Sequence, residues 1–223
     1  MNFFRKTILF LFLISPISTI AQDLKVIEKP IIFDALRIKL SLDYLKRRHN
    51  LSQREPTITP IMIVLHWTAS TSLLGTFNAF NKAVLPSSRK ALAGASNLNV
   101  SSHYLVDRDG TIYQLLPDTI FARHTIGLNY CAIGVENVGS NNYPLTKAQL
   151  LANEKLIRHL AKKYNIQYVI GHYEHTWFRN TSLWRETDPY YHSQKIDPGI
   201  SFMKNVRLVV KDLNLKGAPI RIN

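Results

Sequence analysis

Two segments near the C-terminal end carry side chains suited to metal binding. His172 follows a short apolar run, and residues 195–199, Lys-Ile-Asp-Pro-Gly, hold Asp197 in a turn-forming sequence beyond a loop. His66, far upstream at the end of another apolar run, is the natural third donor. A catalytic zinc ion commonly takes three protein ligands and leaves a fourth position for water. The sequence therefore predicts a zinc site formed by His66, His172 and Asp197.

Two further charged residues suit the remaining roles in amide hydrolysis. Zinc lowers the pKa of its bound water toward about 7 and polarises a carbonyl group. Glu136 is the candidate base for that water. Lys195 lies two residues before Asp197, so in an extended segment both project to the same side, and Lys195 is the candidate cation near the developing oxyanion. Each residue alone has a plain structural explanation, such as a loop junction, a solvated acid or a turn. The hypothesis depends on their joint occurrence.

Three predicted strands position these side chains. In α/β folds, polar residues just beyond the carboxyl ends of buried strands are where sites are built. His66, Glu136 and His172 all lie at such ends. The apolar runs that precede or contain them are residues 61–65, 132–136 and 168–170.

The rest of the chain predicts helices and one hairpin around these strands. Apolar spacing predicts an amphipathic helix over 34–49 and a short helix over 73–83. Residues 103–115 read as a hairpin that turns at an Asp-Gly pair. A capping box at Thr146 opens a long helix. Its predicted apolar stripe consists of Leu150, Leu151, Ile157, Leu160 and Ala161. We therefore predict an α/β fold, a single domain with a central mixed β-sheet flanked by helices.

Composition agrees with one globular domain. The chain has 223 residues, of which 46% are hydrophobic and 19% charged, enough to bury a real core. Cys131 is the sole cysteine, which excludes an intramolecular disulfide and a cysteine-rich zinc ribbon. The net charge of +13 favours an anionic polymer as partner, although charge alone is equally compatible with weak non-specific binding.

The N-terminus resembles a secretory signal. Residues 1–21 contain a basic start, an apolar run and a small-residue cleavage site at Thr19-Ile20-Ala21. The apolar run before Pro16 is too short to span a bilayer, so we expect no stable membrane span after cleavage. We expect a secreted or periplasmic protein, in which an anionic cell envelope is a more natural partner than nucleic acid. The expected divisions are a signal peptide (1–21), an N-terminal helical extension (22–58) and the domain that carries the candidate zinc site (59–215).

Several motifs follow one another in a recognisable order along the chain. They are Ile63-Val64-Leu65-His66-Trp67-Thr68-Ala69, Ser101-Ser102-His103-Tyr104-Leu105-Val106, Asp109-Gly110-Thr111-Ile112-Tyr113-Gln114-Leu115, Ala122-Arg123-His124, Ile133-Gly134-Val135-Glu136, Gly171-His172 and Lys195-Ile196-Asp197-Pro198-Gly199. With these motifs the chain resembles the zinc-dependent N-acetylmuramoyl-L-alanine amidases of the type 2 amidase family, which share their fold with phage amidase-lysozymes and peptidoglycan recognition proteins. The likeness extends over roughly residues 60–203.

The resemblance implies a set of roles. It implies zinc ligands at His66, His172 and Asp197, with Glu136 as general base and Lys195 near the oxyanion. The implied reaction is hydrolysis of the amide between N-acetylmuramic acid and the L-alanine of the peptide stem.

Three more residues are candidates for substrate binding. His124 stands where the family usually has a histidine that lines the substrate groove. Trp67 could stack on sugar, although a core role is the alternative. His103 lies in a strand motif of the family, where packing is at least as good an interpretation as substrate contact.

Two departures from the family pattern affect these assignments. Residues 173–194 are much longer than the corresponding segment of relatives and are rich in aromatic residues. They could form an aromatic, cationic lid over the groove or an insertion that packs on the surface. They also contain His175 and His192, either of which could compete for the metal. Arg123 replaces a tryptophan that is frequent in relatives, which affects substrate preference.

The sequence-based hypothesis is thus a secreted zinc amidase that cleaves peptidoglycan or its fragments, acts as a monomer and binds no nucleic acid. The alternative is a non-catalytic peptidoglycan-binding module of the same fold.

Overall fold

The computed structural model describes residues 24–89, 92 and 94–219. The predicted signal peptide, residues 1–21, lies outside the described residues. No helix within these described ranges is long and apolar enough to cross a membrane.

A six-stranded mixed sheet forms the centre of the molecule, in the order β1-β4-β3-β5-β2-β6. The strands are β1 (Val26–Glu28), β2 (Met62–Trp67), β3 (Tyr104–Val106), β4 (Ile112–Gln114), β5 (Ala132–Asn137) and β6 (Tyr168–Gly171). Every neighbouring pair is parallel except β3 and β4, which form the antiparallel hairpin predicted from the sequence. The predicted α/β class with a mixed sheet is confirmed.

The hairpin turn depends on a glycine. Gly110 has a φ of +89°, a left-handed conformation that residues with a side chain rarely adopt. A Cβ atom at this position would also lie 2.8 Å from the carbonyl oxygen of Ala148. The turn therefore needs glycine both for its backbone conformation and for its contact with the following helix.

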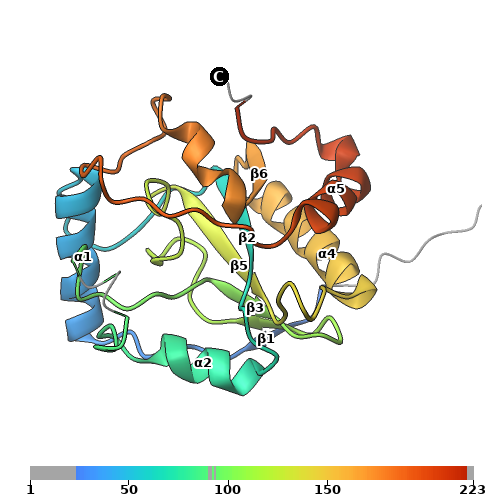
Figure 1. Cartoon of the computed structure of the whole chain (residues 1–223), viewed down its shortest axis with the longest axis horizontal. Helices are drawn as coiled ribbons and strands as arrows, with labels where there is room; N and C mark the ends of the chain where they lie inside the picture. The colour runs from blue at the N-terminus through green and yellow to red at the C-terminus, as the bar shows by residue number, and fades with distance from the viewer. Residues whose placement is uncertain (1–23, 90–91, 93, 220–223) are drawn as a thin grey trace, which may run out of the picture.

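Helices cover both faces of the sheet (Figure 1). The long helix α4 (Lys147–Lys163) and α5 (Ile200–Val209) lie on one face, where Leu156, Ile157 and Met203 pack on strand residues such as Ile63. Helices α1 (Ala35–His49) and α2 (Leu73–Asn81) lie on the other side. Because side chains alternate along a strand, Met62 and Val64 face away from α4 and pack with Phe178. His66 and Glu136 continue this second face.

Helix α4 is capped as predicted, and Ile157 and Leu160 of the predicted stripe are buried, but Leu151 is not. The side chain of Thr146 accepts a hydrogen bond from the backbone N–H of Gln149, and the side-chain oxygen of Gln149 accepts one from the backbone N–H of Thr146. Leu151 is 46% exposed, which corrects its place in the apolar stripe. Gln149 and Asn153 are buried as well, and their amides bond to backbone and side-chain groups at the ends of β3 and β5. These polar contacts anchor α4 beneath the ends of the strands.

The N-terminal segment contributes both a strand and a helix. Strand β1, within the predicted extension 22–58, pairs with β4 at the edge of the sheet. Helix α1 begins after Asp34, whose side chain accepts a hydrogen bond from the backbone N–H of Arg37. Tyr44 and Leu45 of α1 are buried in a cluster with Phe121. The helix thus packs on the site-bearing side of the molecule.

The long segment after β6 has two parts. Residues His172–Phe178 form a 3-10 helix, η1, directly after the strand, and a second short 3-10 helix, η2 (Lys211–Leu213), follows α5. Residues 179–194 have no regular structure, and we call them the strap. Figure 1 shows the chain running from η1 out to one end of α1 and then back across the sheet toward α5.

Candidate active site

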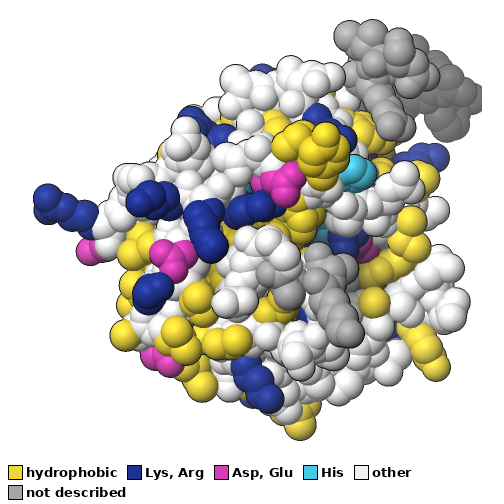
Figure 2. Space-filling view, turned by 60° about the vertical axis from the view of Figure 1, so that its left-hand side comes forward, with side chains coloured by type: hydrophobic (Ala, Val, Ile, Leu, Met, Phe, Trp, Pro, Cys, Tyr) yellow, Lys and Arg dark blue, Asp and Glu magenta, His cyan; other side chains and the backbone are white. Residues whose placement is uncertain are grey.

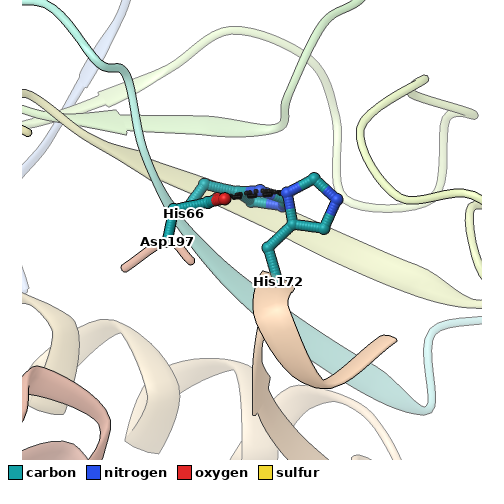
Figure 3. Close-up of side chains that lie close together, drawn as sticks. All are labelled: His66, His172 and Asp197. Atoms are coloured by element: carbon teal, nitrogen blue, oxygen red, sulfur yellow. Dashed lines mark hydrogen bonds and ion pairs between the residues drawn. The ribbon is translucent and has the colours of Figure 1, made fainter. Parts of the chain in front are cut away.

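The structure brings His66, His172 and Asp197 together (Figure 3). His66 Nδ1 lies 2.9 Å from His172 Nδ1 and 3.2 Å from Asp197 Oδ2, and His172 Nδ1 lies 3.1 Å from the same oxygen. The three residues come from β2, the start of η1 and the segment after the strap. All three are buried, with exposed fractions of 1%, 7% and 8%. A single ion could therefore contact all three atoms.

The geometry and chemistry of this group fit zinc. Zinc bonds of about 2.0–2.1 Å in a tetrahedral arrangement separate neighbouring ligand atoms by about 3.3 Å, close to the observed triangle. Burial lowers the pKa of His172 to about 3, so its imidazole is neutral, the form that binds metals. Burial alone would raise the pKa of Asp197, but the two histidines outweigh it and lower that pKa below its usual range. Two imidazoles and a carboxylate are a typical donor set for zinc.

His124 fixes the orientation of His66. The Nε2–H of His124 donates to the carbonyl oxygen of Ala132 at 3.1 Å, which leaves Nδ1 as the acceptor. His66 Nε2 lies 3.1 Å from that atom and therefore carries the hydrogen. The lone pair of His66 is then on Nδ1, the atom that faces His172 and Asp197. Histidine ligands commonly donate their other N–H to such a partner.

Gly134 makes room for this histidine pair. A Cβ atom at Gly134 would lie 2.7 Å from the ring of His124, closer than real contacts allow. The glycine in β5 therefore lets the imidazole of His124 lie directly against the sheet beside His66.

Glu136 lies beside His66 on the neighbouring strand. The two residues are paired in the register of β2 and β5 and project from the same face. Burial and the nearby Asp197 carboxylate raise the pKa of Glu136 well above its usual range, and Lys195 and Arg89 oppose this shift. Oε2 of Glu136 is buried without a hydrogen-bond partner among the described residues. Its free oxygen is therefore available to a water or a ligand.

A cavity of about 390 Å³ connects these groups. The three candidate ligands, Glu136 and His124 all line it, and so do Trp67 and the exposed side chain of Lys195. All the predicted site residues except His103 therefore face one cavity.

His103 is the exception. Its side chain is fully buried and does not line the cavity. Its Nδ1 accepts a hydrogen bond from the backbone N–H of Gly134 at 3.0 Å, and its Nε2 donates to the carbonyl of Ile120 at 2.8 Å. Both ring nitrogens are thus used by the backbone, and burial lowers the pKa of His103 to about 4. The structure corrects the substrate-binding assignment in favour of packing.

The alternative histidine ligands are not members of the cluster. His175 is fully buried, and its Nδ1 donates to the carbonyl of His172 at 2.7 Å. His192 is exposed and lines a different cavity, which Lys195 also lines. Neither belongs to the group that could hold a metal within the described part of the chain.

Although Tyr191 belongs to the segment considered as a possible lid, the sequence did not show that three particular residues form one wall of the cavity. Tyr44 of α1, Tyr191 of the strap and Arg123 all line it, although they are far apart in the chain. Arg123 stands out in the sequence where relatives often have tryptophan, which was the available signal. Tyr44 carried no signal, because its apolar helical spacing predicts only a core position.

Comparisons with known proteins identify the family of the chain. Residues 56–200 match the family described as N-acetylmuramoyl-L-alanine amidase (Amidase_2), and the match covers more than half of the chain. The chain therefore belongs to this family. A comparison with curated proteins finds no match.

Solved structures share the fold. N-acetylmuramoyl-L-alanine amidase LysC from Clostridium intestinale URNW has 20% identity and a TM-score of 0.52, over 86% of this chain and 99% of that one. The endolysin LysCS of the same organism has 21% identity and the same score, over 86% and 97%. AmpD, solved as a selenomethionine derivative, has 21% identity and a score of 0.52, over 82% and 93%. At these identities the likeness concerns the fold.

Proposed function

We propose that this protein is a zinc-dependent N-acetylmuramoyl-L-alanine amidase that hydrolyses the bond between N-acetylmuramic acid and L-alanine in peptidoglycan or its fragments. Family membership supports a protein that acts on peptidoglycan. The observation that carries the catalytic proposal is the triangle of ligand atoms from His66, His172 and Asp197 in one cavity with Glu136.

Each residue of the site would have a separate role in the reaction. When bound, zinc would make a water molecule more acidic and polarise the scissile carbonyl group. Glu136, with its free Oε2, would take the proton of the attacking water and then pass it to the leaving nitrogen. Lys195 would place a positive charge near the oxygen on which negative charge develops. His124 would keep His66 Nδ1 aimed at the metal.

A paired measurement of activity and metal content tests this proposal. Purified protein should release the stem peptide from muropeptides, as detected by mass spectrometry. It should lose this activity with a chelator and recover it with zinc. Glu136→Gln should lower kcat by about 10²–10⁴ and leave the zinc content unchanged, because Glu136 is not a ligand. Equal activity of Glu136→Gln and the wild-type protein would refute the mechanism. Binding to cell wall without zinc or hydrolysis would instead support the alternative of a non-catalytic peptidoglycan-binding module.

Secretion is part of the proposal and has its own test. The motivation is the signal-like sequence of residues 1–21. Fractionation of producing cells, with N-terminal sequencing of the protein, should find a form that begins near residue 22 outside the cytoplasm. A full-length protein confined to the cytoplasm would overturn this part without affecting the reaction.

A further inference from the structure

The strap is fastened to helix α1 by several polar contacts. Arg48 of α1 forms an ion pair with Glu186 at 2.9 Å, and both side chains are almost fully buried. The backbone N–H of Thr187 donates to the carbonyl of Arg48 at 3.1 Å, and the Thr187 hydroxyl donates to that of Arg47 at 2.7 Å. Helix α1 lies outside residues 56–200, the segment that matches the family. The contact is therefore built by a part of this chain that the family match does not include.

This contact places Tyr191 in the cavity wall. The guanidinium group of Arg48 lies 4.5 Å from the centre of the Tyr191 ring. The Tyr191 hydroxyl accepts a hydrogen bond from Arg123 at 3.1 Å. Tyr191 is thus held between two arginines and lines the same cavity as the candidate metal ligands. Figure 2, which brings the α1 side forward, shows that Lys and Arg side chains predominate over Asp and Glu on this face.

Arg123 is a buried, positively charged residue of this wall. It is only 3% exposed, and its guanidinium group donates to the backbone carbonyls of Ser96, Leu98 and Leu92. Among the ion pairs of residues 24–89, 92 and 94–219, none involves Arg123. A buried charge is costly unless it is paired, so an anion bound beside Arg123 would gain a strong interaction.

Tyr44 adds an unused donor to the same wall. Its side chain is 1% exposed and lines the cavity, and its ring lies 5.2 Å from the Arg123 guanidinium group. Within the described residues its hydroxyl group has no hydrogen-bond partner. Burial raises the pKa of Tyr44, and the neighbouring Tyr191 raises it further. The Tyr44 hydroxyl group therefore keeps its proton and can donate a hydrogen bond. A buried polar group without a partner in the protein suits a ligand acceptor.

We propose that Tyr44, Arg123 and Tyr191 form a subsite for a carboxylate of the peptide part of the ligand. The wall offers a positive charge and hydroxyl donors, which is the complement of a carboxylate. The cavity extends from this wall to the three candidate metal ligands, so one ligand can contact both. The peptide identity of the ligand rests on the proposed function, whereas the preference for a carboxylate rests on the wall itself.

Two probes test the subsite by binding. Both are muramyl tripeptides of identical sequence, one with free carboxylates and the other with every carboxylate converted to a carboxamide. Calorimetric titrations use the Glu136→Gln background, so that neither probe is hydrolysed. The Glu136→Gln protein, called the parent here, should bind the carboxylate probe on the order of tenfold more tightly than the carboxamide probe. The reason is that hydrogen bonds to charged groups are stronger than those to neutral groups.

Tyr44→Phe removes only the hydroxyl group and keeps the buried ring. Affinity for the carboxylate probe should fall about tenfold or more, and affinity for the carboxamide probe should fall less. The matched control is Tyr143→Phe, since Tyr143 is 56% exposed and does not line the cavity. It should retain the affinities of the parent. Circular dichroism melting of each variant should show that the fold is retained.

The results separate the subsite from the amidase activity. Equal affinity of the parent for both probes, or equal losses with Tyr44→Phe, would overturn the carboxylate subsite even if the wild-type protein is an active amidase. A carboxylate preference that Tyr44→Phe reduces would support the subsite, even if the wild-type protein hydrolyses nothing.

Discussion

Replacing His124 by phenylalanine would remove the acceptor that orients His66 and keep a ring of similar shape against Gly134. His66 Nε2–H would lose its bond of 3.1 Å to His124 Nδ1. The loss of such a partner of a metal-binding histidine typically lowers metal affinity 10-fold to 100-fold, or about 1.4–2.8 kcal/mol. The hydroxyl group of Thr125 lies 3.5 Å from His66 Nε2 and is released from its own contact with His124 by the substitution. It can partly replace the acceptor, so we expect a loss near tenfold.

The zinc dissociation constant is measured by competition with a chelating dye, for the wild-type protein and for His124→Phe. His159→Phe is the matched control, because His159 is exposed on α4 and lies away from the cavity. The control should bind zinc like the wild-type protein. If His124→Phe also keeps the wild-type zinc affinity while KM for a muropeptide rises, His124 contacts the substrate and does not orient His66. That result would refute our reasoning.

Two other predictions concern stability. Arg48→Met leaves the carboxylate of Glu186, whose side chain is 1% exposed, without its partner. Breaking a buried pair costs about 3–5 kcal/mol, so Tm should fall by roughly 6–20 °C for a chain of this size, and Arg48→Met/Glu186→Gln should recover part of the loss. Equal Tm values for the single and double variants would contradict a stabilising role of the ion pair. The second prediction concerns the pH dependence of stability at Asp118. Burial alone would raise the pKa of Asp118, but hydrogen bonds from Lys163 and two tyrosines outweigh it and lower that pKa. The stabilisation is therefore complete above the unfolded pKa of about 3.9 and is lost as the pH falls through the lower folded value. Lys163→Met should reduce urea stability at pH 6 more than at pH 2.5, and an equal reduction at both would exclude this linkage.

The local sequence predicted the elements because their signals are local. The capping box at Thr146 and the Asp-Gly turn before Thr111 involve neighbours in the chain, and both appear in the structure. The apolar run that leads to His66 is a buried strand for the same reason, since an uninterrupted β-branched run suits a sheet covered on both faces. The carboxyl ends of parallel strands then bring His66 and Glu136 side by side.

The motif residues predicted the membership of the cluster but not its detailed geometry. His103 and His124 are both histidines in family-like motifs, yet one is enclosed by backbone groups and the other lines the cavity beside His66. Which of the two is enclosed depends on the neighbouring strands. Residue type alone does not contain that information.

The sequence by itself therefore determined the sheet, its helices and the candidate metal ligands, because strand ends and short motifs specify them locally. Only the tertiary structure decided which residues form the wall of the cavity beside Arg123. Tyr44, Arg123 and Tyr191 meet there because the strap returns to α1 and forms the buried Arg48–Glu186 pair. No periodicity or motif records a contact between residues so far apart in the chain, since it arises only when two surfaces of the folded molecule pack together.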